Sequence, residues 1–89
     1  MVMDASYDVS AEIHWVVREG AALMRQLDVD PARRAAFYRR KEVLNRTLAM
    51  RHPEDSEERQ LGLQDATIAE ELAVHYEDLA RGAAITAAG

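Results

Sequence analysis

The chain has 89 residues, a formal net charge of −5 and 48% hydrophobic residues, which suits one small globular domain. It contains no cysteine, so disulfides, thiolate metal sites and cysteine nucleophiles are excluded. No apolar run reaches the roughly 18 to 20 residues of a membrane span, and we expect a cytoplasmic protein. Only two prolines and four glycines, with abundant Ala, Leu, Glu and Arg, predict an all-α fold.

The charge is divided along the chain. Residues 31–51 carry seven Lys or Arg residues and a single Glu, a formal charge of +6. Residues 1–30 carry −4 and residues 52–89 carry −7. This division predicts a basic helix packed between two acidic ones, and the alternative is an exposed basic face that binds a partner.

The first helix is predicted over Ala11–Leu27, after a flexible lead-in at residues 1–9. Asp8 or Ser10 can accept the first backbone N–H groups as the N-cap. Apolar residues recur at spacings of three and four, which is typical of the core-facing side of a helix. This stripe comprises Ile13, Val16, Val17, Gly20, Leu23, Met24 and Leu27.

Trp15 falls on the other side of this helix, away from the apolar stripe. A large aromatic side chain in that position favours a partner contact, because Trp is enriched at protein interfaces. We therefore predict a partner or dimer interface made by Trp15, Ala22 and Gln26. The alternative is that the N-terminal segment folds back over Trp15.

The second helix is predicted to begin at Pro31 with Asp30 as its N-cap. Its link to the first helix is short, which favours an antiparallel hairpin. Arg33, Arg40 and Arg51 lie within or near its packing arc, where a guanidinium needs a carboxylate from another helix or subunit. Arg40 is the leading candidate for such an ion pair. The alternative is an arginine pocket that binds a phosphate or carboxylate ligand.

The third helix is predicted from Glu57 to about Arg81, since Pro53 ends the second helix and Asp55 or Ser56 can cap the next. One stripe stays in phase along it and favours a single long helix. The stripe comprises Leu61, Ile68, Leu72, His75, Tyr76 and Leu79. The alternative is a break near Gly62–Asp65. Gly82 is expected to stop the helix, which leaves a folded domain at 10–82 and a tail at 83–89 that either frays or continues as helix.

The sequence carries no recognisable catalytic, cofactor or metal site. The histidines at 14, 52 and 75 have no spacing of three or four between them, which a helical metal site would need. The neighbouring carboxylates of the third helix point to different faces, and acid–base chemistry requires two groups that face one site. We expect a protein without enzymatic activity and without a cofactor.

The stretch Ala66–Arg81 resembles the core of helix-turn-helix regulators. The resemblance rests on the small residues Ala69 and Ala73, on Val74 directly after Ala73, and on the apolar Leu79. It implies a turn after Ala73 and a second helix, from about Tyr76, that lies in the major groove of DNA.

Together these observations predict a small three-helix bundle. An antiparallel hairpin of the first two helices is joined by a long third helix, and the bundle is completed by dimerisation. The function that we expect is a non-catalytic protein–protein interaction or regulatory adaptor protein that self-associates or binds another protein. One alternative is a helix-turn-helix-like DNA-binding protein, and a minor alternative is a small helical enzyme with an arginine-lined anion pocket.

Overall fold

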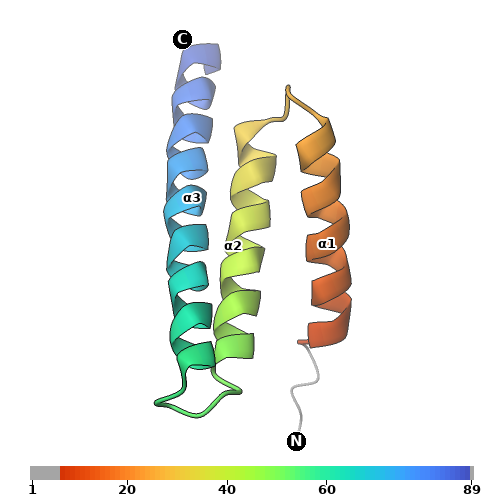
Figure 1. The fold of residues 1–89 in the computed structure, drawn as a ribbon. Helices are drawn as coiled ribbons and strands as arrows, with labels where there is room; N and C mark the ends of the chain where they lie inside the picture. Colours follow the sequence, from red (N-terminus) through yellow and green to blue (C-terminus); the bar gives the residue numbers. More distant parts are fainter. Residues whose placement is uncertain (1–6, 89) are drawn as a thin grey trace, which may run out of the picture.

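The computed structural model contains three helices: α1 (Val9–Arg25), α2 (Pro31–Ala49) and α3 (Glu57–Ala88). It describes residues 7–88, with the side-chain surroundings of residues 7–83. All the regular secondary structure in this range is helical, which confirms the predicted all-α chain of three helices. The helices lie side by side with α2 in the middle (Figure 1).

The start of α1 follows from its capping residue. Asp8 has an extended backbone, and its Oδ1 accepts a hydrogen bond from the Ala11 N–H at 3.1 Å. The helix ends at Arg25, two residues before the predicted end, because the backbone of Gln26 is extended. Leu27 therefore lies outside the helix and is 99% exposed, so its assignment to the core stripe is wrong.

The start of α2 agrees with the prediction. Asp30 is the N-cap and its Oδ1 accepts a hydrogen bond from the Ala32 N–H at 2.9 Å. Pro31 occupies the first helical position, where its missing N–H has no cost. The next cap is Ser56, whose Oγ accepts a hydrogen bond from the Arg59 N–H at 3.1 Å.

The third helix is continuous from Glu57 to Ala88, as the single apolar stripe predicted. Gly82 does not stop α3. Its φ is not positive, so it lacks the left-handed conformation with which a glycine ends a helix. Residues 83–88 continue α3, which is one of the two outcomes that the sequence left open for the predicted tail.

The three helices form an open layer. α2 packs closely along α3 and also contacts α1, whereas α1 and α3 make no contact in the described part of the chain. Arg40, which pairs with Glu12 of α1, and Ala49, which lies against Gly62 of α3, are nine residues apart. At about 100° per residue this places them on opposite sides of α2. A closed bundle, in which the first and third helices would meet, does not form.

Alanine dominates the interface between α2 and α3. Since α2 is the one helix that α3 contacts in the described part of the chain, the buried Ala66, Ala69 and Ala73 mark the side of α3 that faces α2. Gly62 extends this row, and a Cβ atom added there would lie 2.7 Å from the Cβ of Ala49. Among residues 7–83, the buried hydrophobic residues are Leu23, Ala35, Phe37, Leu44, Ala49, Ala66, Ala69 and Ala73.

Two glycines of α3 allow a matched test of this close contact. Gly62→Ala should destabilise the protein by about 1 to 3 kcal/mol, because the added methyl overlaps Ala49 and overpacks the interface. Gly82→Ala should stabilise it by up to about 1 kcal/mol, since nothing lies within 4 Å of the added Cβ and Ala favours the helix. Urea unfolding of both variants checks the prediction, and stabilisation by Gly62→Ala would contradict the close approach.

Candidate interaction surface

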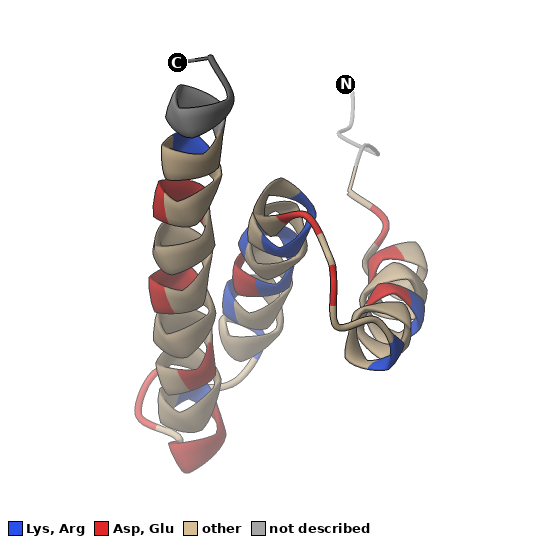
Figure 2. Ribbon diagram, turned by 90° about the horizontal axis from the view of Figure 1, so that it is seen from above, with Lys and Arg blue, Asp and Glu red and all other residues tan. Residues whose placement is uncertain are grey.

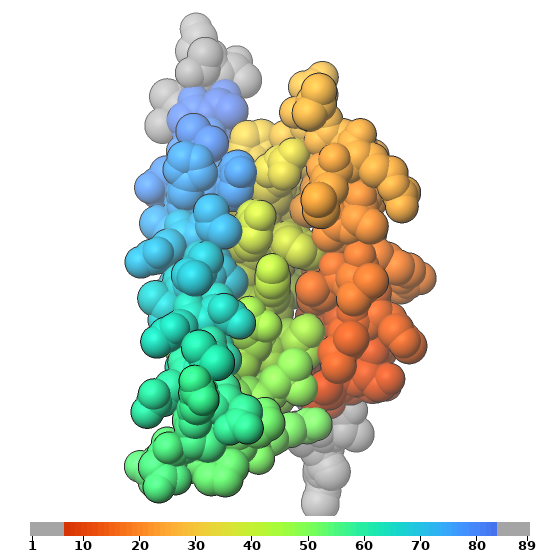
Figure 3. Space-filling view, in the orientation of Figure 1, coloured from red at the N-terminus to blue at the C-terminus, as the bar shows by residue number. Residues whose placement is uncertain are grey.

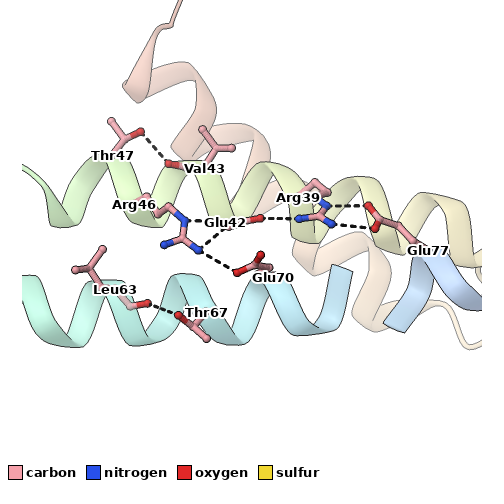
Figure 4. A network of polar contacts seen from close by, with 9 residues as sticks. All are labelled: Arg39, Glu42, Val43, Arg46, Thr47, Leu63, Thr67, Glu70 and Glu77. Carbon is pink, nitrogen blue, oxygen red and sulfur yellow. Dashed lines mark hydrogen bonds and ion pairs between the residues drawn. The ribbon is translucent and has the colours of Figure 1, made fainter. Parts of the chain in front are cut away.

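A network of ion pairs joins α2 to α3 along one side of the layer (Figure 4). The guanidinium of Arg39 donates two hydrogen bonds to the carboxylate of Glu77, at 2.8 and 2.9 Å. Arg46 donates to Glu70 of α3 at 3.2 Å, and Glu42 accepts from both arginines. Bidentate geometry makes the first of these pairs directional as well as electrostatic.

A second set of ion pairs joins α2 to α1. Arg40 donates to both carboxylate oxygens of Glu12, at 2.9 and 2.7 Å, and its guanidinium carbon lies 3.5 Å from the centre of the Trp15 ring. One side chain thus combines a bidentate ion pair with a cation–π contact. Arg33 makes the equivalent bidentate pair with Glu19, at 2.8 and 2.9 Å.

The pairs depress the pKa values of the carboxylates. Hydrogen bonds from the paired arginines hold the pKa values of Glu12, Glu19 and Glu77 below the ordinary 4.5, against a smaller opposing effect of desolvation. The arginine side chains of these pairs are 40 to 45% exposed, so each pair is only partly shielded from water. Each pair is therefore a modest source of stability.

The positive charge of α2 is largely matched by its neighbours. Figure 2 shows Lys and Arg concentrated on α2, between the acidic residues of α1 and α3. Arg33 and Arg40 pair with α1, while Arg39 and Arg46 pair with α3. Three other cations of residues 31–51, Arg34, Lys41 and Arg51, take part in none of the ion pairs among the described residues, and Arg51 is exposed beyond the end of α2.

Trp15 does not stand apart from the other helices. Its ring centre lies 6.1 Å from that of Phe37 on α2, and Arg40 covers its face. The prediction that Trp15 points away from the core is therefore wrong, since Trp15 is on the side of α1 that meets α2. Ala22 is half-buried, and Gln26 is exposed and accepts a hydrogen bond from Arg33 at 3.4 Å. The alternative cover for Trp15 is the N-terminal segment with Val2, Met3 or Tyr7; Val2 and Met3 lie outside the described residues, and Tyr7 is exposed.

The apolar stripe predicted for the core of α1 is instead partly exposed. Leu23 is buried, but Val17 is 65% and Met24 is 87% exposed. The apolar stripe of α3 is also partly exposed, because alanines occupy the side of α3 that faces α2. Large side chains of this second stripe are exposed at Leu61, Ile68 and Leu79.

Both stripes border the same side of the layer. A groove of about 430 Å³ between α1 and α2 is lined by Val17, Met24, Tyr38 and Lys41, among others. A smaller hollow of about 250 Å³ between α2 and α3 is lined by Tyr38 and Lys41 again, together with Ile68. Because both hollows share Tyr38 and Lys41, they open on one side of α2. We call this side, with the stripes of α1 and α3 that border it, the open face.

The space-filling view agrees with this description, because α2 forms the floor of a furrow between the two outer helices (Figure 3). The stacked rings of Tyr38 and Tyr76, with centres 5.8 Å apart and planes at 5°, hold α2 against α3. The open face therefore has a floor on α2 and two apolar walls. Sequence reasoning found the large apolar residues of the walls, such as Val17, Met24 and Ile68, but assigned them to a core.

The segment that resembles helix-turn-helix regulators has a different structure. Ala66–Arg81 is an uninterrupted part of α3, so the turn that the resemblance implies after Ala73 does not form. Ala73 is fully buried at the contact with α2. The two-helix geometry that would enter the major groove is not present in this segment.

Comparison with family models, with curated proteins and with solved structures finds no match to this chain. Within the described residues, none of the helices has the length and apolar content needed to cross a membrane. The same residues hold no cluster of three or more His, Asp or Glu side chains placed to bind a metal ion.

Arg40 and Arg51 provide a matched test of the contacts of α1. Arg40→Ala should lower the free energy of unfolding by about 1 kcal/mol, because one substitution removes both the Glu12 pair and the Trp15 contact. Arg51→Ala should change it by less than about 0.5 kcal/mol, as is usual for an exposed residue. Thermal unfolding followed by circular dichroism measures both. Equal effects of the two substitutions would argue against the Arg40 contacts.

Acid should weaken the fold through the same ion pairs. The pKa values of Glu12, Glu19 and Glu77 are lower in the folded chain, so folding binds fewer protons and their contribution is full above the ordinary 4.5. Stability should fall as the pH drops below that value. Unfolding measured from neutral pH downward tests this, with the triple Glu→Gln variant at 12, 19 and 77 as control. An equally steep decline in that variant would assign the acid sensitivity to other groups.

Proposed function

We propose that this protein is a non-catalytic helical interaction protein that works by self-association through the open face. The observation that carries the proposal is the exposure, on one side of the layer, of the apolar stripes of α1 and α3. Exposed apolar surface of this extent, in contiguous rows, is typical of a docking surface. Its rim is polar, as at most protein interfaces.

The energetics favour a covered open face. Burying a Val, Leu or Ile side chain contributes roughly 1.5 to 3 kcal/mol, and several such side chains stand on this face. A chain of this size gains little stability from its own small core. An additional helical layer would bury the stripes of α1 and α3 without any change in the contacts within the layer.

The charged surfaces fit the alternatives less well. A phosphate-binding surface needs arginines that are free to meet the ligand. Arg33, Arg39 and Arg46 are engaged by carboxylates of neighbouring helices. The proposed role is therefore that of an adaptor or regulator which presents a helical surface to its own copies or to a partner helix.

Sedimentation equilibrium tests self-association. The wild-type chain should show a concentration-dependent mass above the 10.0 kDa of one chain. Ile68→Glu should reduce the mass towards that of the monomer, because a charge is placed within the open face. Val43→Glu is the matched control, since Val43 is 50% exposed but lies about 200° around α2 from Lys41.

A monomer at every concentration would contradict self-association. A loss of association in both variants would show that the open face is not the docking surface.

A further inference from the structure

The exposed wall of α3 contains a heptad pattern that is separate from its alanine row. The residues follow one another at alternating spacings of four and three, as at the a and d positions of a coiled coil. We call this row the outer seam, and it comprises Leu61, Asp65, Ile68, Leu72, His75 and Leu79. All six are exposed except Leu72, which is partly covered.

The outer seam has two polar members, and they decide the direction in which two copies could pair. In a parallel pair each residue meets its own equivalent, so Asp65 would face Asp65 of the second copy. Facing carboxylates repel, and a charged group at a seam needs a partner of opposite charge or a hydrogen bond. In an antiparallel pair an a residue meets a d residue, so Asp65 can meet a different side chain.

One antiparallel register matches every position of the outer seam. When Ile68 faces Leu72 of the second copy, Leu61 faces Leu79 of that copy and Asp65 faces its His75. Each of these pairs occurs twice by symmetry, so six layers are filled and each carboxylate faces an imidazole. A shift by one heptad would set Asp65 against Ile68 or Gly82 of the second copy, neither of which offers a side-chain hydrogen-bond partner.

We propose that a second copy of this chain covers the open face by pairing its α3 antiparallel to the first in this register. The inference rests on the proposed function and names its partner and geometry. The matched layers from Leu61 to Leu79 span about 27 Å at 1.5 Å per residue. The alanine row stays buried against α2, so pairing requires no rearrangement of the layer.

A charge exchange tests the register. His75→Asp should weaken the dimer on the order of tenfold, since two carboxylates then face each other in each of two symmetric layers. Asp65→Lys should weaken it similarly. The double variant Asp65→Lys/His75→Asp should recover the wild-type dissociation constant to within about threefold, because opposite charges face each other again. Circular dichroism at low concentration verifies that each variant is folded.

The outcomes separate this inference from the proposed function. A wild-type monomer removes both. If the wild type associates and Ile68→Glu dissociates it, while His75→Asp has no effect or the double variant fails to recover, the open face remains the docking surface and the register is wrong.

Disulfide formation gives a second, independent measurement. The chain has no cysteine, so engineered thiols are the only ones present. Leu61→Cys/Leu79→Cys should form a covalent dimer on oxidation, because the two positions are too far apart within one helix, at about 27 Å, to bridge each other. The mismatched variant Leu61→Cys/His75→Cys should form much less. Equal yields of dimer from the two variants would overturn the register.

Discussion

The close approach of α2 and α3 at Ala49 and Gly62 is the constraint on which the rest of the structure depends. Only small residues allow two helices to lie this close, and Ala66, Ala69 and Ala73 continue the contact along α3. This contact fixes the rotation of α3 about its own axis. Once the alanine row faces α2, helical geometry turns the outer seam towards the open face. The exposed surface is thus a direct consequence of how the buried one is packed.

The middle helix explains why the layer stays open. α2 is the most basic part of the chain, and it presents arginines on two opposite sides. Arg40 meets Glu12 of α1, and Arg39 meets Glu77 of α3 (Figure 4). The carboxylates of α1 and those of α3 therefore meet arginines on different sides of α2.

Local features of the fold could be predicted from sequence because they depend on neighbouring residues. Asp30 followed by Pro31 specifies a helix start. The Asp30 carboxylate accepts a hydrogen bond from a free backbone N–H of the first turn, and Pro31 has no N–H that would need a partner. The uninterrupted phase of the α3 stripe across Gly62 specified a single helix. Charge segregation indicated a basic helix between acidic ones, and the paired arginines have that arrangement. In each case the decisive interaction lies within the helix or follows from net charge.

The candidate site could not be predicted because it depends on which side of α3 faces α2. Hydrophobic periodicity assigns the larger side chains to a core, and by that rule Leu61 and Ile68 should be buried. Two helices that pack closely need small side chains where they touch, so alanine occupies the contact instead. Trp15 was misplaced for a related reason. Its position was judged against the apolar stripe of α1, whereas a guanidinium, that of Arg40, covers it.

Within residues 7–88, α1 is attached through α2 alone, and this has a dynamic consequence. A helix with a single neighbour can leave the layer without disturbing the contact between the other two. Its departure would break the pairs of Arg33 and Arg40 and uncover Phe37, while Ala49 and Gly62 remained together. Because α2 packs more extensively against α3 than against α1, we expect α1 to open at a lower free energy than the α2–α3 hairpin.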